Sequence, residues 1–597
     1  MHQLLRLGTQ LIPHLTSGFI MVRKVVLAAL LTATHVFGRE ELDDDDLRRA
    51  FPSCSAKAFD HSKFDLAGVA ITSLTANLQI GYSAVDLVDQ IPFMTDLFFC
   101  QVKVHLNHEG SDDTALVEIW LPPKKEDWNG RFQATGGAGF ATGMFDTYLA
   151  PALKQGYAAA STDGGHDGKR VDDLSWALKV DGDVNWNLLH NFATRSLAEQ
   201  IVVGKSITEQ YYGEKPHHSY WNGCSAGGRQ GYAIAQKYPH LVDGILANSP
   251  GISMTNFVMG DFWPQLVMKE AGVWMSHCEF DFFRQKAMED CDMLDGVSDG
   301  VITDPGVCDF DPLHVIGKTF YCDGEEGQVT HAMADVVRRI EEGPRGPFKG
   351  KIWHGFPVGT NTHYVAAITT SAKGLRFPMP FPISSKFIQT LLVRDPSFNV
   401  TKLSYGDYMA LWAQASSEYG WLLDADEPDL HTLKEAGTKL LTWHGINDPI
   451  IPYHNTVAYR KRVEAVMGGA HNVDQFYRLF LAPGVEHCGG GAAPAPRDEL
   501  AALVDWVENG EAPETLEANT VNAEGDMVTR DLCAWPGKLK YMGIGDAKRA
   551  SSWSCVGSTE RPEVEFETAG NADDRPGQIL GGLKDKLQGL GLGLKIG

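Results

Sequence analysis

The residues best suited to chemistry in this chain are a serine and a histidine, each next to a cysteine. Residues 223–227 read GCSAG, a G-x-S-x-G pattern that is typical of a nucleophilic serine, here Ser225. The imidazole of His487 stands directly before Cys488. If Cys224 and Cys488 form a disulfide, their Cα atoms lie roughly 5.5 Å apart. A hydroxyl and an imidazole would then be neighbours, an arrangement that favours nucleophilic catalysis.

The G-x-S-x-G pattern occurs twice, and only context separates the two copies. Residues 296–300 read GVSDG, with Ser298 among aspartate-rich turns and no strand before it. A nucleophile elbow needs a strand before the serine and a helix after it. Ser225 follows the strand-like residues 219–221 and precedes the helix-like residues 229–238. We therefore assign the nucleophile to Ser225; the alternative is a serine that serves only a tight turn.

A base and an acid can be assigned from chain order. Where a serine sits on such an elbow, the acid follows it and the histidine comes last. Asp448 follows the strand-like residues 439–443, and His487 follows a second strand candidate, 475–481. We expect Ser225 to attack, His487 to move protons, and Asp448 to orient the imidazole and stabilise its charged form.

Each partner of the serine has a plainer alternative. Asp448 precedes a proline, and an aspartate at that place is common in β-turns. Most of the 21 histidines should be structural or surface groups. His444 could compete with His487 as the base, but its place at a strand end favours a packing role.

An acyl transfer site also needs two backbone N–H groups aimed at the developing oxyanion. We expect one from Ala226, directly after the nucleophile, and the other from Gly137 in the glycine-rich turn at 136–139. The alternative for this turn is a flexible loop without a catalytic donor.

The elements that position these groups form an α/β pattern with an interruption. Strand-like and helix-like segments alternate before about residue 251 and again from residue 429, which predicts a parallel sheet covered on both faces. Residues 252–425 differ, with acidic turns, prolines and many aromatic residues, and we expect them to form an insertion above the strand ends. The expected strands are 115–121, 131–134, 157–162, 219–221, 242–247, 439–443 and 475–481, and the expected helices are 191–211, 229–238 and 501–507.

Composition and charge narrow the class of protein. The 597 residues are 43% hydrophobic with a net charge of −24, which argues against partners such as nucleic acid or an anionic membrane. A basic stretch, a short apolar run and small residues predict a signal peptide at 1–38, with Met21 as an alternative start, and hence secretion. The acidic, then Gly/Leu-rich tail at 558–597 should be mobile. Residues 39–251 and 426–557 would then be the catalytic domain.

The ten cysteines fit an exported chain, because an even number without a C-x-x-C motif indicates disulfides. Sequence does not fix connectivity. Spacing suggests Cys54–Cys100, Cys224–Cys488, Cys291–Cys308 and Cys533–Cys555, and leaves Cys278 and Cys322 as a pair by default. A sequon begins at Asn399 and predicts a glycan there.

At these motifs the chain resembles the tannase and feruloyl esterase family of secreted serine esterases. The resemblance implies an α/β-hydrolase core, a lid domain at 252–425, a Ser–His–Asp triad clasped by a disulfide, and hydrolysis of phenolic acid esters. Two departures concern residues 247–250, which read ANSP where the family has a small Gly-Ala-Pro-Ala run, and Cys278, which the family pattern lacks. The matching segments are 136–140, 162–166, 223–231, 443–448 and 483–491.

Residues 291–301 contain three aspartates between glycine turns and could bind a metal ion. Ca²⁺ prefers carboxylate and carbonyl oxygens, which the side chains of Asp292, Asp295 and Asp299 and the carbonyls of Val297 and Val301 could supply. Spacing alone slightly favours an acidic surface turn, whereas the resemblance implies a structural Ca²⁺ at matching positions. We expect no organic cofactor.

The leading hypothesis is a secreted serine ester hydrolase acting on hydroxycinnamate esters of the feruloyl type through an acyl-enzyme. The substrate would be a small or polysaccharide-linked aromatic ester. Two alternatives remain open at this point: a tannase acting on gallate esters, and a non-catalytic secreted binding protein of the same fold. Oligomeric state is open.

Overall fold

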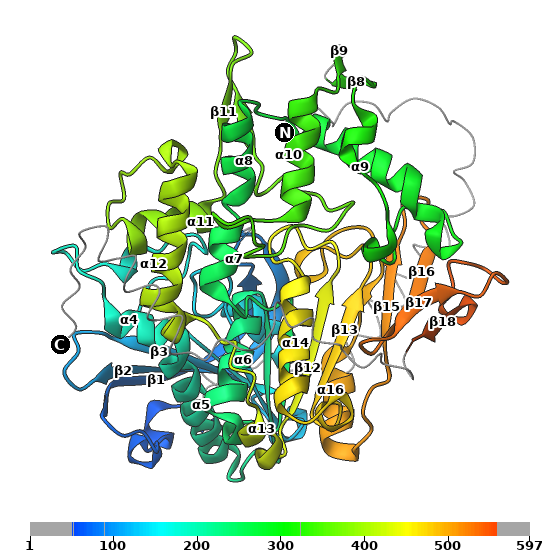
Figure 1. Cartoon of the computed structure of the whole chain (residues 1–597). Coiled ribbons are helices and arrows are strands. Elements are labelled where there is room, and N and C mark those ends of the chain that lie inside the picture. Colours follow the sequence, from blue (N-terminus) through cyan, green and yellow to red (C-terminus); the bar gives the residue numbers. More distant parts are fainter. Residues whose placement is uncertain (1–50, 52, 89, 323, 558–597) are drawn as a thin grey trace, which may run out of the picture. The chain divides into compact units, whose positions relative to one another are not determined.

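The computed structural model describes residues 51–557, apart from 52, 89 and 323. The predicted signal peptide and the predicted tail lie outside these residues, so both stay predictions. The described chain divides into two compact units, whose helices and strands are drawn in Figure 1. Unit 1 contains the described residues up to 134, then 144–166 and 199–218, and unit 2 contains 135–143, 167–198 and the described residues from 219 on.

Five strands of unit 1 follow the order β1-β2-β3-β5-β4. β1, β2 and β3 follow one another through short connections without a crossover helix, and such neighbours pair antiparallel. β3 and β5 are also antiparallel, and only β4 and β5 run parallel. The predicted all-parallel sheet is therefore wrong for unit 1. The bounds are β1 Val69–Val85, β2 Pro92–His108, β3 Ala115–Leu121, β4 Arg131–Thr135 and β5 Ala158–Thr162.

The strands of unit 2 that carry the predicted site follow the order β6-β7-β12-β13, and all are parallel. Every residue of β7 is buried, as expected for a strand that is covered on both faces. Because parallel strands end at the same edge, the residues that follow them meet there. The bounds are β6 His218–Cys224, β7 Gly244–Asn248, β12 Lys439–Gly445 and β13 Tyr477–Ala482.

The helices fall into those outside the inserted segment, residues 252–425, and those within it. The first group is α3 Asp146–Lys154, α4 Trp186–His190, α5 Ser196–Tyr212, α6 Ala226–Lys237, α13 His431–Ala436, α14 His454–Val466, α15 Ala470–Val473 and α16 Glu499–Asn509. The second is α7 Met254–Gly260, α8 Trp263–Ala271, α9 His277–Cys291, α10 His331–Glu342, α11 Pro382–Phe387 and α12 Tyr405–Leu423. The helix expected at 191–211 is present: α4 continues through a π-helical segment, residues 191–195, directly into α5.

The inserted segment has its own apolar core, and its helices are built to bury one face. In α10 the buried residues Met333, Val336, Val337 and Ile340 recur at helical spacing. Capping boxes start α9 at Ser276 and α12 at Ser404. The inserted segment and Ser225 both belong to unit 2, so the division into units does not mark this segment as a domain of its own. Its role as a lid domain stays a prediction.

Short antiparallel strands complete the described chain. They form a sheet of β14 Ala495–Pro496, β15 Thr515–Val521 and β16 Met527–Cys533, and the pairs β8 Thr319–Cys322 with β9 Glu325–Gln328, β10 Ile368–Thr370 with β11 Arg376–Pro378, and β17 Lys538–Tyr541 with β18 Trp553–Val556. Within the described ranges, no helix has both the length and the apolar character needed to cross a bilayer.

Candidate active site

Ser225 occupies the sharp turn between β6 and α6, the local structure that a nucleophile elbow requires. Its backbone has φ 63° and ψ −121°, a strained conformation for a residue with a side chain. The Ser225 N–H donates to the carbonyl of Asn248 at the end of the neighbouring strand, at 3.0 Å. A Cβ added to Gly223 would lie 2.6 Å from the Gly227 carbonyl, so the turn needs glycine there.

The other G-x-S-x-G copy forms no elbow. Ser298 follows α9 in a turn, and its hydroxyl donates to Asp292 Oδ2 at 2.8 Å. The context argument from the sequence therefore separates the two serines in the way that the structure does.

Asp448 and His487 form a short acid–imidazole contact. His487 Nδ1 lies 2.6 Å from Asp448 Oδ2, and the aspartate is fully buried. The N–H groups of Ile450 and Ile451 donate to Asp448 Oδ1 at 2.9 and 2.8 Å. Burial alone would raise the pKa of Asp448, but the charge of His487 and the hydrogen bonds from two imidazoles outweigh it and hold that pKa well below its usual range. The acid thus stays ionised and can stabilise an imidazolium.

His444 is the second imidazole at this aspartate. Its Nε2 lies 2.9 Å from the carbonyl of Ile451 and 3.2 Å from Asp448 Oδ2, while Nδ1 lies 2.9 Å from Thr456 Oγ1. Because a carbonyl only accepts, this pattern assigns the proton to Nε2. His444 is fully buried, so it is a positioning residue for Asp448 and not only the packing residue that we expected.

The two cysteines beside the predicted nucleophile and base form a disulfide. Cys224 and Cys488 are 264 residues apart in sequence, and their Cα atoms are 6.0 Å apart. The Cys488 N–H also donates to the hydroxyl of buried Ser249 at 3.4 Å. Ser225 and His487 therefore sit one residue away from a shared covalent bond.

The glycine-rich turn is held by a residue that the sequence did not indicate. Gln230 Oε1 accepts from the Gly137 N–H at 2.9 Å, and Gln230 Nε2 donates to the Thr142 carbonyl at 3.0 Å. The Gly137 N–H thus already donates a hydrogen bond to Gln230, which argues against our choice of Gly137 as an oxyanion donor. Within residues 135–143, the N–H groups of Ala138, Gly139 and Gly143 donate none of the described hydrogen bonds, and neither does the N–H of Ala226 after the serine.

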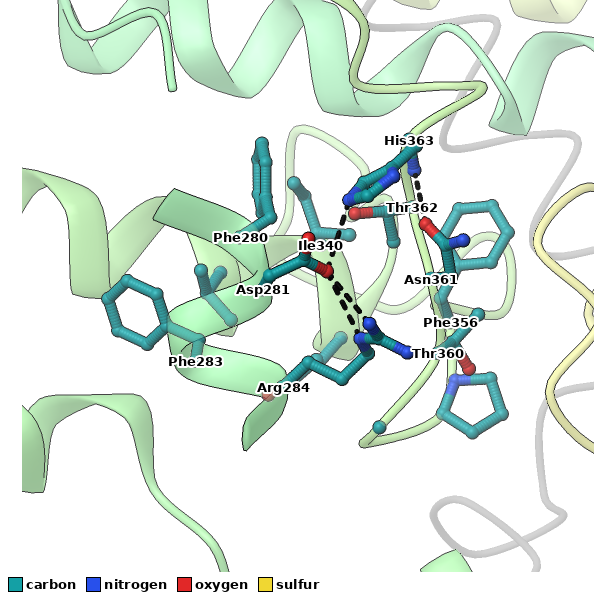
Figure 2. Close-up of a pocket in the computed structure, with 14 residues that line it drawn as sticks. Phe280, Asp281, Phe283, Arg284, Ile340, Phe356, Thr360, Asn361, Thr362 and His363 are labelled. Atoms are coloured by element: carbon teal, nitrogen blue, oxygen red, sulfur yellow. Dashed lines mark hydrogen bonds and ion pairs between the residues drawn. The ribbon is translucent and has the colours of Figure 1, made fainter. Parts of the chain in front are cut away.

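Asn447 is a further residue that sequence analysis missed. Its Oδ1 accepts from the Gly484 N–H at 3.1 Å, on the loop that carries His487. Its Nδ2 lies 3.5 Å from Thr360 Oγ1 in the inserted segment. Thr360 lines a pocket within this segment, together with Phe356 and the ion-paired Asp281 and Arg284 (Figure 2). A neighbour of the predicted acid therefore joins the His487 loop to the inserted segment.

The residues of the predicted calcium loop hydrogen-bond within the protein. Asp292 Oδ1 accepts from the N–H groups of Asp299, Gly300 and Val301 at 3.1–3.3 Å. Asp295 accepts from the Val297 N–H, and Asp299 Oδ2 lies 2.9 Å from Arg530 Nη2. Burial raises the pKa of Asp299, against the effect of Arg530. The carboxylate and carbonyl oxygens of this loop suit a hard cation, but the carboxylate of Asp299 already contacts the guanidinium of Arg530.

The remaining cysteines are all paired. The structure contains the suggested disulfides Cys54–Cys100, Cys291–Cys308 and Cys533–Cys555, and it also pairs Cys278 with Cys322. Glycosylation at Asn399 stays a prediction.

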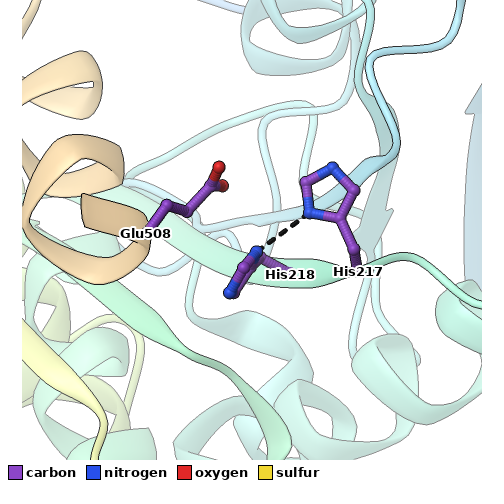
Figure 3. Close-up of side chains that lie close together, drawn as sticks. All are labelled: His217, His218 and Glu508. Carbon is purple, nitrogen blue, oxygen red and sulfur yellow. Dashed lines mark hydrogen bonds between the residues drawn. The ribbon is translucent and has the colours of Figure 1, made fainter.

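Another histidine pair, His217 and His218, has Nδ1 atoms 2.9 Å apart (Figure 3). It stands at the start of β6, and Ser225 follows the end of that strand, roughly 20 Å along it. This pair is therefore no candidate for the base.

The fold and the elbow define an α/β-hydrolase, and comparison with known proteins identifies the family. A family model described as "Tannase and feruloyl esterase" matches residues 100–556, and the chain belongs to that family. A probable feruloyl esterase of Arthroderma benhamiae is 44% identical over 77% of this chain and 86% of its own length. Feruloyl esterase B of Aspergillus niger is 30% identical over 83% of this chain and 94% of its own length.

A solved structure agrees with this assignment. Tannin acyl hydrolase from Aspergillus niger aligns with a TM-score of 0.76 at 26% identity, covering 84% of this chain and 94% of that one. The expected α/β-hydrolase fold is thus confirmed, and the protein is a carboxylic ester hydrolase.

The elbow geometry leads to a test of stability. Gly223→Ala should lower the free energy of unfolding by about 2 kcal/mol or more, because its Cβ would overlap the Gly227 backbone. Urea unfolding measures the change. Gly406→Ala in α12 is the control, because its Cβ would meet only Ser404 Oγ at 3.8 Å. Equal stability of Gly223→Ala and the wild type would contradict the close approach.

The disulfide clasp leads to a test of activity. The double variant Cys224→Ala/Cys488→Ala should lose at least tenfold in kcat at a temperature where circular dichroism shows it folded, because the predicted base is no longer tied to the predicted nucleophile. Cys533→Ala/Cys555→Ala removes a disulfide that joins β16 and β18. It should cost a few kcal/mol of stability without an equal loss of kcat. Equal kcat losses in both variants would reduce the clasp to a general stabilising bond.

Proposed function

We propose that this protein is a secreted serine esterase that hydrolyses phenolic acid esters of the hydroxycinnamate type. The observation that carries the proposal is the Cys224–Cys488 bond, which ties the elbow serine to a histidine whose other ring nitrogen contacts buried Asp448. The names of the two relatives above support a feruloyl substrate. Membership of a family of tannases and feruloyl esterases argues against the non-catalytic alternative.

The reaction begins with acylation of Ser225. Its Oγ attacks the ester carbonyl carbon as His487 Nε2 takes the hydroxyl proton, and Asp448 stabilises the resulting imidazolium. The tetrahedral oxyanion accepts hydrogen bonds from the Ala226 N–H and, in place of Gly137, from the Ala138 N–H. His487 then gives its proton to the alcohol oxygen, the C–O bond breaks, and the alcohol leaves behind an acyl-enzyme.

Deacylation repeats these steps with water. His487 takes a proton from water as the water oxygen attacks the acyl carbon, and then returns a proton to Ser225 Oγ as that bond breaks. The products are the phenolic acid and the regenerated serine. No organic cofactor takes part.

Secretion is supported by the redox chemistry of the chain. Disulfides persist in oxidising compartments and are rare in the cytosol, and all ten cysteines are paired, five bonds in all. An exported protein would also be able to carry the predicted glycan at Asn399.

Substitution of the nucleophile tests the mechanism and the substrate together. Ser225→Ala should lower kcat/KM on methyl ferulate by at least about 10³-fold, because loss of a triad nucleophile removes covalent catalysis. The matched control is Ser298→Ala, the serine of the other G-x-S-x-G copy, which should keep most activity. A loss of less than tenfold in Ser225→Ala would remove this residue from its role. Faster turnover of methyl gallate than of methyl ferulate would favour a tannase activity instead.

We also propose that residues 291–301 bind a structural Ca²⁺ through Asp292, Asp295, Asp299 and the carbonyls of Val297 and Val301. The ion would hold a turn that supports the catalytic histidine, since a Cβ on Gly484 would lie 3.0 Å from the Val301 side chain. It would take no part in the reaction steps.

Removal of metal tests this site. Dialysis against EGTA should lower the melting temperature by several degrees, because a bound ligand stabilises the folded state, and Ca²⁺ but not Mg²⁺ should restore it. Asp295→Asn should weaken this restoration. An unchanged melting temperature, with less than one Ca²⁺ per ten chains by mass spectrometry, would show that Arg530 alone balances the charge of Asp299.

A further inference from the structure

Two tryptophans form an exposed aromatic surface away from the residues of the predicted triad. Trp186 begins α4 and Trp421 lies near the end of α12, two helices that stand side by side in unit 2 (Figure 1). Their ring centroids are 6.2 Å apart with an interplanar angle of 29°. The side chains are 39% and 61% exposed. We call this pair the tryptophan platform.

The platform is rigid because buried aromatic residues support it. Tyr419, which is fully buried, stacks on Trp186 with centroids 5.6 Å apart and an interplanar angle of 20°. His190 packs against Trp421 at 5.5 Å. The Trp421 Nε1–H donates to the Glu418 carbonyl at 3.0 Å, which fixes the ring on the helix. The exposed parts of the two rings are thus held in place before any ligand arrives.

Planar hydrogen-bonding side chains lie along the same face of α12. Gln414, Glu418 and Trp421 are spaced by four and three residues and therefore line one side of the helix. Gln414 Nε2 lies 3.3 Å from Glu418 Oε2, and Arg394 Nη2 lies 3.8 Å from the same oxygen. The rim of the platform thus offers amide, carboxylate and guanidinium groups with nearly balanced charge.

The chemistry of this surface suits a sugar chain. Aromatic faces carry negative quadrupole charge and attract the weakly positive C–H groups on one face of a pyranose ring. The rim groups can exchange hydrogen bonds with hydroxyls, as donors or acceptors. Two adjacent, partly exposed indole rings together offer a larger apolar surface than either ring alone.

The net charge of the chain favours a neutral polysaccharide over an anionic polymer and over an anionic lipid surface. The chain has a net charge of −24, which repels polyanions such as polygalacturonate and anionic bilayers. Burial and the nearby Arg195 lower the pKa of His190, so this imidazole is neutral at neutral pH and adds no anion site. A neutral glycan meets no such repulsion.

We infer that the tryptophan platform is a non-catalytic binding site for a neutral polysaccharide, and that it holds the enzyme on the polymer that bears its ester substrate. Binding at a second site raises the effective concentration of esters near Ser225 without any new contact at the catalytic residues. The choice of an ester-bearing polymer rests on the proposed function, whereas glycan binding itself does not.

The test separates the platform from the catalytic site. The full-length Ser225→Ala protein is incubated with insoluble arabinoxylan from which alkali has removed all esters, so that the catalytic site has no ligand. The bound fraction gives an affinity. Trp421→Ala in the same background should weaken binding at least tenfold, and Trp421→Phe should retain part of it. Phe348→Ala is the control, because Phe348 is an exposed aromatic residue outside the platform, 98% exposed against 61% for Trp421.

Turnover of methyl ferulate by the otherwise wild-type Trp421→Ala enzyme should be unchanged, while release of ferulate from feruloylated arabinoxylan should fall. Unchanged arabinoxylan binding by Trp421→Ala, or no binding by the parent, would overturn the inference. Equal binding of the parent to polygalacturonate would also overturn it, and capture of a protein partner in place of glycan would assign the platform to a protein interface. Failure of methyl ferulate turnover alone would count against the proposed function and not against the platform.

Discussion

The disulfide between Cys224 and Cys488 is the constraint on which the arrangement of the predicted catalytic residues depends. It joins the end of β6 to the loop after β13, and these strands are at opposite ends of the parallel set β6-β7-β12-β13. Nothing in strand pairing alone would bring a loop from one end of this set to the other. The disulfide joins the two loops at the residues next to Ser225 and His487, so these two side chains have little freedom to separate.

The second requirement is a carboxylate that stays charged inside the protein. A buried charge is expensive unless hydrogen bonds and an opposite charge compensate it. Asp448 receives two backbone N–H groups on one oxygen and two imidazoles on the other. His444 is held by Thr456 and the Ile451 carbonyl, so the network extends into buried structure. The aspartate is thereby fixed in position as well as in charge, and it can orient His487 without movement during the reaction.

Short sequence motifs predicted those parts of the structure that neighbouring residues determine. β3 occupies 115–121 as expected, and the elbow around Ser225 and the chain order of the triad candidates follow from short motifs. The β1–β2 hairpin was missed because only two residues of β1 are buried, polar and apolar residues mix along it, and its pairing with β2 has several register shifts. Gln230 and Gly137 are 93 residues apart, and Arg530 and Asp299 are 231 apart. Contacts between residues so far apart depend on the tertiary fold, and no short sequence pattern indicates them.

The inserted segment contributes to the site through polar contacts with the loops after the strands. Asn447 connects the His487 loop to Thr360, and the hydroxyl of Thr255 and the N–H of the same residue donate to Asp424 at the two ends of the segment. Buried Arg229, four residues after the nucleophile, donates to the Leu423 carbonyl. Such bonds are costly to break where water is excluded, so the segment and the elbow are held as one body near these points. The side chains between these anchors, where the sequence departs most from a regular α/β pattern, are not fixed by these bonds.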